Sequence, residues 1–241
     1  MTDTILVPFE LPDHKALSPV LVNDLASLDV VVLGHFAVPE QTPVEAAREQ
    51  FEAEAQTTLD KIADQFRDVG ATARTRLVFG KQRAATIDRV MIEEDCAAEL
   101  NPAPTDGIDR ILVPIPAADN FDRLPRFVDI LCEDSTREIT LFHVAEGEES
   151  RDHAEEIVTE TREEMLEAGF DADAVDTLVV EGDSHDSEIL TVAADYDAVV
   201  MYEAQSELSD HIFGSLPDRI GDETGDPVIV VRRDYDPSAT D

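Results

Sequence analysis

The chain has 241 residues, of which 55 are acidic and 18 basic, so its formal net charge at pH 7 is −37. This charge argues against nonspecific binding to nucleic acid or to an anionic membrane surface, because both are polyanions. Apolar residues make up 43% of the chain, which excludes a disordered acidic polymer and supplies enough material for one or two buried cores.

The first half of the chain alternates short apolar segments with segments of helical period. Ile5 to Pro8 is expected to open a strand, and the apolar run Val30 to Leu33 is typical of a parallel strand covered on both faces. Between residues 44 and 69, apolar side chains recur every three or four positions, which predicts an amphipathic helix that ends at Gly70. The other elements expected in this half are a third strand ending at Gly80, a short helix over Ala84 to Glu94 and a strand at Cys96 to Leu100.

The second half repeats this order and extends it by one strand. An amphipathic segment from Ile157 to Ala168 ends at Gly169, and a short helix is expected from Ser187 to Ala194. Two further apolar strands, Ala198 to Met201 and Pro227 to Val231, close the chain. The first half has no counterpart of the last strand.

Three segments of the first half recur in the same order about a hundred residues later, which indicates a duplicated unit. The joint lies at Asn101 to Gly107, where two prolines and a glycine interrupt the periodicity. We therefore predict an α/β fold of two tandem, doubly wound parallel-sheet domains, with four strands in residues 1–105 and five in residues 106–241. The recurring pairs are Ile5–Pro8 with Ile111–Pro114, Leu33–Phe36 with Leu141–Val144, and Leu77–Gly80 with Val179–Gly182.

The end of each strand in the second half carries further characteristic residues. The second strand ends at His143 and Val144, the third ends at Gly182 ahead of Ser187 to Leu190, and the closing segment runs from Phe213 to Arg232. In this order and spacing, the features resemble the universal stress protein family in a tandem, haloarchaeal-like form. The resemblance implies a Rossmann-like fold, here with a truncated first domain, and domains that pair across their last strands.

The same resemblance directs attention to a nucleotide site. Members that bind ATP carry the loop Gly-x-x-Gly, nine residues, then Gly-Ser or Gly-Thr, because bare backbone N–H groups surround the phosphates. Here Met201 and Ala204 occupy the first two glycine positions. The acidic residue that the family uses to read adenine is Pro116 in the second half and Glu10 in the first. The residues left to contact a nucleotide are Val144, Gly182, Gly214 and Ser215.

The loop over residues 203–211 is electrostatically unsuited to a triphosphate, because it holds three carboxylates and one histidine. We therefore expect no cofactor and a non-catalytic regulatory or stress-response protein that binds an unknown protein partner. Two alternatives stay open. One is a nucleotide-binding stress sensor or weak ATPase, whose ATP binding a divalent or potassium ion could rescue. The other is an accessory regulator of a membrane transporter, which the family's fused members suggest.

Other polar residues are better explained by structure than by chemistry. His35 and His143 occupy equivalent strand ends, but without a clustered third ligand we expect them to face a crevice or the core, with no metal site. Ser184 lies beside two aspartates and a histidine, yet adjacent residues cannot align a catalytic triad, so we expect a helix cap. Acid pairs such as Glu93 and Glu94 are expected to lie on exposed, solvated helix faces.

Dispersed acid and only three lysines are typical of a protein adapted to molar salt, where the Debye length falls to ~3 Å. The chain shows neither a basic leader nor a long apolar segment, so we expect a cytoplasmic protein without membrane insertion. Cys96 and Cys132 are expected to be buried, reduced thiols. Pro227 to Arg233 is the one edge strand available for pairing, so we expect a homodimer through it.

Overall fold

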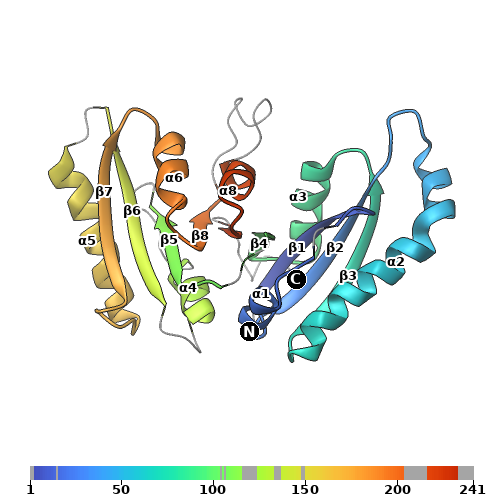
Figure 1. Cartoon of the computed structure of the whole chain (residues 1–241), viewed down its shortest axis with the longest axis horizontal. Coiled ribbons are helices and arrows are strands. Elements are labelled where there is room, and N and C mark those ends of the chain that lie inside the picture. Colours follow the sequence, from blue (N-terminus) through green and yellow to red (C-terminus); the bar gives the residue numbers. More distant parts are fainter. Residues whose placement is uncertain are drawn as a thin grey trace. The chain divides into compact units, whose positions relative to one another are not determined.

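The computed structural model describes residues 3–14, 16–103, 105, 107–115, 124–132, 137–147, 150–203 and 216–232 (Figure 1). These residues form two compact units that divide between residues 104 and 105. This division lies within the joint that the prolines and glycine of residues 101–107 predict. Among the described residues, no helix has both the length and the apolar character needed to cross a bilayer.

The first unit is a parallel sheet in the order β3-β2-β1-β4, with three helices between its strands. The central residues of β1 and β2 are all buried, because helices cover both faces of the sheet. The elements of this unit are β1 (Thr4–Leu11), α1 (Pro19–Asp24), β2 (Asp29–Ala37), α2 (Val44–Asp68), β3 (Thr72–Gly80), α3 (Arg83–Glu93) and β4 (Ala98–Asn101).

The second unit repeats the arrangement with one more strand, in the order β7-β6-β5-β8-β9, and its strand pairs are again parallel. The predicted α/β fold of doubly wound parallel sheets is confirmed. The elements of this unit are β5 (Arg110–Pro114), α4 (Leu124–Cys132), β6 (Glu138–Glu146), α5 (Arg151–Glu167), β7 (Val175–Gly182), α6 (His185–Ala193), β8 (Ala198–Tyr202), α8 (Leu216–Thr224) and β9 (Val228–Val231).

Each face of the first sheet has its own core, and Figure 1 shows α2 and α3 on opposite sides of the strands. Leu6 and Leu33 pack with Ile87 and Met91 of α3 on one face. On the other face, strand residues such as Phe79 pack with the alanines of α2. Because side chains alternate along a strand, residues two positions apart share a face, and this places the side chain of His35 on the α3 face with Leu33.

Glycines end the two long helices as predicted. Gly70 follows α2 with a φ of +101°, and Gly169 follows α5 with a φ of +109°. Only glycine adopts this left-handed conformation without steric cost, and it lets the chain turn back into the next strand. Both positions are open around the missing Cβ, so backbone conformation alone explains the choice of glycine there.

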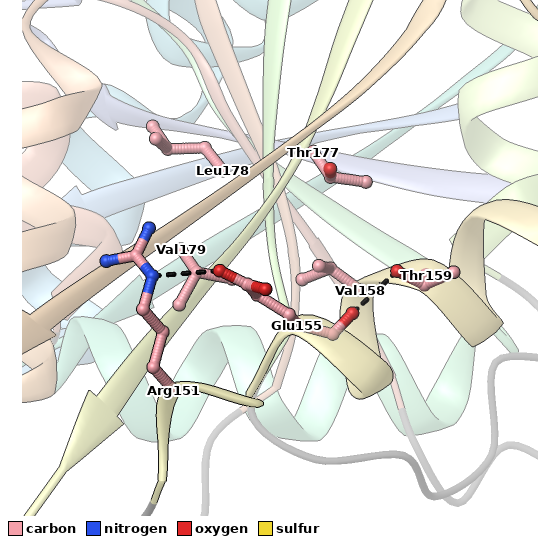
Figure 2. Close-up of a pocket in the computed structure, with 7 residues that line it drawn as sticks. All are labelled: Arg151, Glu155, Val158, Thr159, Thr177, Leu178 and Val179. Atoms are coloured by element: carbon pink, nitrogen blue, oxygen red, sulfur yellow. Dashed lines mark hydrogen bonds and ion pairs between the residues drawn. The ribbon is translucent and has the colours of Figure 1, made fainter. Parts of the chain in front are cut away.

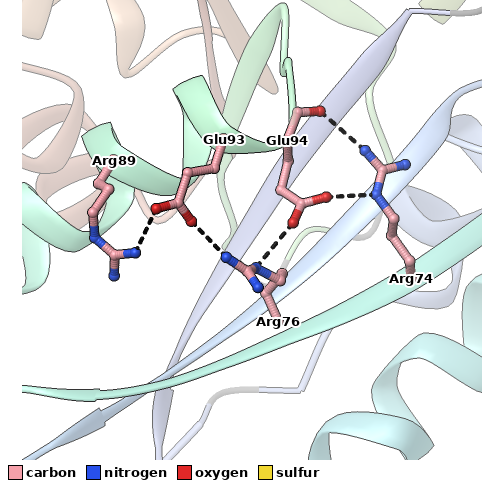
Figure 3. A network of polar contacts seen from close by, with 5 residues as sticks. All are labelled: Arg74, Arg76, Arg89, Glu93 and Glu94. Atoms are coloured by element: carbon pink, nitrogen blue, oxygen red, sulfur yellow. Dashed lines mark hydrogen bonds and ion pairs between the residues drawn. The ribbon is translucent and has the colours of Figure 1, made fainter.

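Glu93 is exposed as predicted, but Glu94 is half-buried, and both carboxylates pair with arginines, which the sequence does not predict (Figure 3). Arg74 Nε donates to Glu94 Oε2 at 2.9 Å, and Arg76 Nη2 donates to Glu93 Oε2 at 2.5 Å. The hydrogen bond that Arg89 donates to Glu93 lowers the pKa of that carboxyl below its usual range, and Arg76 adds to the effect. The network joins β3 to α3.

Candidate functional site

The carboxyl ends of the parallel strands are the candidate site in each unit, because loops at this end of an open α/β sheet form the ligand crevice. In the second unit, β6 and β7 end side by side, with Glu146 in register with Gly182. His143 lies three residues before Glu146 in β6 and is buried. Its Nδ1 lies 2.6 Å from the carbonyl oxygen of Ile115, which can only accept, so Nδ1 carries the proton and donates.

Acidic side chains fill this end of the second unit. A Cβ on Gly182 would lie 2.4 Å from Cγ of Glu188, so the Glu188 side chain packs directly over the glycine backbone. Glu146 Oε1 accepts a hydrogen bond from the backbone N–H of His185, the first residue of α6. The positive end of the α6 dipole is therefore already neutralised by a carboxylate of the same unit.

Two of the four predicted nucleotide contacts, Val144 and Gly182, lie at this end of the sheet. The Val144 side chain is buried in a core cluster with Leu112 and Ile189, and Glu188 covers Gly182. Gly214 and Ser215, together with Ala204 and Pro116, lie outside the described residues. Met201 lies in β8 and is also buried in this core.

The equivalent end of the first unit has a different character. Glu10 on β1 is exposed and stands in register with His35 on β2. His35 is 1% exposed, and neither ring nitrogen has a hydrogen-bond partner among the residues that the structure describes. Burial lowers the pKa of His35 below 6.5, the nearby Arg83 lowers it further, and Glu10 acts in the opposite direction.

The residues around the first helix turn at this end are basic. A Cβ on Gly80 would lie 3.4 Å from His35 Nε2 and 3.6 Å from Thr86 Oγ1. Gln82 precedes α3 without a side-chain capping bond, and the first turn of α3 contains Arg83 and no acid. Lys81 Nζ donates to the backbone oxygen of Glu40 at 2.5 Å.

Within the described part of the chain, no group of three or more histidine, cysteine or acidic residues is placed to hold a metal ion. The expectation that His35 and His143 face a crevice or the core agrees with their burial at strand ends. The predicted helix cap is confirmed, because Ser184 Oγ accepts from the backbone N–H of Ser187. The cap begins α6 at His185, two residues earlier than the sequence predicts. Neither cysteine is part of a disulfide. Cys96 is buried as predicted, whereas Cys132 is only partly buried, so the prediction of a buried thiol is wrong there.

A pocket that the sequence does not predict lies beside β7, away from the strand ends (Figure 2). It has a volume of about 270 Å³ and lies between the first half of α5 and the middle of β7. Its one arginine, Arg151, is neutralised by Glu155, with 2.8 Å between Nε and Oε1. The pocket is lined by Arg151, Glu155, Val158, Thr159, Thr177, Leu178 and Val179.

Sequence reasoning also missed the residues that distinguish the two sheet ends. The repeat alignment places Gly80 opposite Gly182, and the residues that follow differ in sign: Lys81 and Arg83 in one unit, Asp186 and Glu188 in the other. Comparing charges across the aligned repeat would therefore have found the contrast.

Comparison with known proteins gives one family match. A sequence model of the universal stress protein family matches residues 107–232, slightly more than half of the chain. No curated protein matches the chain significantly in sequence.

Three solved structures share the two-unit fold. A universal stress protein from Archaeoglobus fulgidus is 14% identical with a TM-score of 0.65, over 96% of each chain. A protein of unknown function from Pseudomonas aeruginosa is 16% identical with a TM-score of 0.54, over 97% of this chain and 93% of that one. The cytoplasmic domain of a prokaryotic cation chloride cotransporter is 11% identical with a TM-score of 0.51, over 95% of each chain. At these identities the likeness shows the fold alone.

Proposed function

The chain belongs to the universal stress protein family, and on this premise we propose that it is a non-catalytic stress-response regulator. It acts by binding a partner protein, and ATP is neither bound tightly nor hydrolysed. The observation that carries the proposal is the acid-filled sheet end of the second unit, where Glu188 packs over Gly182 and Glu146 accepts from the first N–H of α6.

Electrostatics supports this proposal. A carboxylate within ~4 Å of a phosphate costs on the order of 1 kcal/mol in water-like surroundings and more when buried. Glu146 and Glu188 lie at the carboxyl ends of β6 and β7, the end of an open α/β sheet at which ligands bind. The sequence of residues 203–211 adds three more carboxylates. Met201 and Ala204 replace the glycines that would open the backbone to phosphate.

Isothermal titration with ATP and magnesium in molar KCl tests the proposal. We expect no saturable binding. A dissociation constant below about 100 μM, or ~5.5 kcal/mol, would overturn the proposal in favour of a nucleotide-binding sensor or weak ATPase. The double variant Glu146→Gln/Glu188→Gln should gain affinity if these two carboxylates are the obstacle. The matched control is Glu163→Gln/Glu164→Gln, which removes two acids from α5 and should change nothing.

We propose further that the protein works in a salt-rich cytoplasm and pairs with a second copy through β9. Salt screens the net charge of −37, so two copies can approach. β9 ends the strand order of its own unit, but Val228 is already buried in that unit's core. Val230 is the one side chain of β9 that is only half-buried, so it is the one that could contact a second copy. A monomer by light scattering in molar KCl would overturn this part of the proposal.

A second candidate function is regulation of a membrane transporter. The cotransporter domain named above shares the two-unit fold across nearly its whole length, and in that protein the fold is attached to a transporter. If this candidate is correct, the tagged chain should co-purify with one integral membrane protein from its native membranes in molar KCl. Recovery from the soluble fraction alone would contradict it.

A further inference from the structure

The sheet end of the first unit holds a buried imidazole that nothing in the described residues satisfies. Both ring nitrogens of His35 lack a hydrogen-bond partner there, although the residue is 1% exposed. A buried polar group without a partner is destabilising, so such groups call for a specific explanation. The equivalent His143 of the second unit donates to the Ile115 carbonyl, which shows that the fold can satisfy a histidine at this position.

The imidazole of His35 lies beside Gly80, with Nε2 as the atom nearest to the position that a Cβ on Gly80 would take. A Cβ there would lie 3.4 Å from His35 Nε2 and 3.6 Å from Thr86 Oγ1, both in or near contact. The φ of Gly80 lies outside the left-handed range, so its backbone does not require glycine. The glycine leaves no side chain between its backbone and His35 Nε2, a potential hydrogen-bond donor.

The helix that follows supplies positive charge at the same place. α3 has 11 residues, begins after Gln82 without a side-chain cap, and carries Arg83 at its first position. The free N–H groups and the dipole of a helix N-terminus favour anions. Arg83 is close enough to His35 to oppose its protonation electrostatically. In a chain with only 18 basic residues, Lys81 and Arg83 lie two positions apart.

We propose that this end of the first unit binds a small oxyanion of the phosphate class. Its oxygens accept hydrogen bonds from the free N–H groups of the first turn of α3 and from Arg83. His35 turns its Nε2–H toward the bound anion, because that atom is buried without a hydrogen-bond partner among the described residues. Glu10 is the opposing charge on β1. Because its carboxylate is exposed, salt screens it more strongly than it screens contacts at the helix end.

In the second unit, carboxylates of the chain itself occupy the positions equivalent to the proposed anion site. There Glu188 fills the space beside the equivalent Gly182, and Glu146 accepts from the first N–H of the equivalent helix, α6. Extending the match of Leu33–Phe36 with Leu141–Val144 by two residues aligns Glu146 with Val38. Val38 is apolar and buried, so the first unit has no carboxylate at this position. The carboxylates of one unit thus mark where an external anion would sit in the other.

Titration of the full chain with inorganic phosphate tests the proposal, in molar KCl at constant ionic strength and followed by calorimetry. We expect saturable binding at pH 7.5, where the anion carries its full charge and the neutral imidazole of His35 can still donate from Nε2. A parallel titration with glycerol phosphate shows whether the site also accepts a phosphomonoester. Absence of saturable binding with both would overturn the proposal.

Two variants and one control locate the site. Gly80→Ala places a methyl group between the Gly80 backbone and His35 Nε2, and Arg83→Gln removes the cation, so each should weaken binding at least tenfold. Arg89→Gln is the matched control, since Arg89 lies further along α3 and pairs with Glu93, and it should leave binding unchanged. Phosphate binding that survives both Gly80→Ala and Arg83→Gln would overturn the assignment. Arg83 is partly exposed, so its variant decides the question even if Gly80→Ala fails to fold. The proposal does not depend on the function proposed for the second unit.

Discussion

The two sheet ends of this molecule have the same backbone plan and opposite chemistry. In the first unit, an α3 N-terminus without a side-chain cap, Arg83 and a His35 without a hydrogen-bond partner among the described residues lie near Gly80. In the second, Glu188 packs against the equivalent Gly182, and His143 donates a hydrogen bond to the Ile115 carbonyl. The difference teaches that a duplicated fold does not duplicate a site. Binding chemistry depends on a few side chains whose charge can reverse while the strands and helices stay.

Substituting the two equivalent histidines, His35 and His143, should give the largest difference in free energy of unfolding between the two units. His143→Leu leaves the buried Ile115 carbonyl without its donor, which costs about 1–3 kcal/mol. His35→Leu removes no hydrogen bond within the described residues, so at pH 8 its free energy of unfolding should change less. Guanidinium denaturation of both variants in molar KCl measures the difference. Equal losses would show that the bond of His143 contributes little.

The next largest difference is expected between alanine substitutions of the two aligned glycines, measured as the loss of free energy of unfolding. Gly182→Ala places Cβ 2.4 Å from Glu188 Cγ, so the side chain must move and overpacking of about 1–3 kcal/mol is expected. Gly80→Ala meets its nearest atom at 3.4 Å, so its effect on stability should be below about 1 kcal/mol. Thermal unfolding of the two variants beside the parent chain tests this order. A larger loss for Gly80→Ala would mean that the neighbours of Gly80 accommodate a methyl group less well than Glu188 does at Gly182.

The strands, the helices and the glycines that end them could be predicted from the sequence because their signals are local. A period of three or four residues, an apolar run or a glycine after a helix is visible within a short window. The side chain of Glu188 over Gly182 and the pairing of Arg74 with Glu94, twenty residues apart, are contacts that only the folded chain brings together. Gly214 and Ser215 lie outside the described residues, so their nucleotide role stays a prediction.

The smallest expected effect is a pH dependence of the free energy of unfolding, which arises from His35 in the first unit. The unfolded chain takes up a proton at His35 near pH 6.5, but burial and Arg83 keep the folded histidine neutral to lower pH. The unfolded state therefore binds more protons in this window, and the free energy of unfolding falls as the pH drops below 6.5.

Denaturation of the parent chain and of His35→Leu at several pH values between 8 and 5.5 measures this contribution. One such group changes stability by at most ~1.4 kcal/mol per pH unit. The variant should lose stability less steeply on acidification than the parent chain. Identical slopes in the two proteins would show that His35 does not titrate differently on folding.

A crystal structure of the full chain, grown from molar KCl with phosphate, ATP and magnesium present together, tests the central contrast most directly. The account predicts an oxyanion against Gly80 and Arg83 in the first unit, and no nucleotide at the strand ends of the second. A nucleotide bound beside Val144 and Gly182, with the first unit empty, would contradict it.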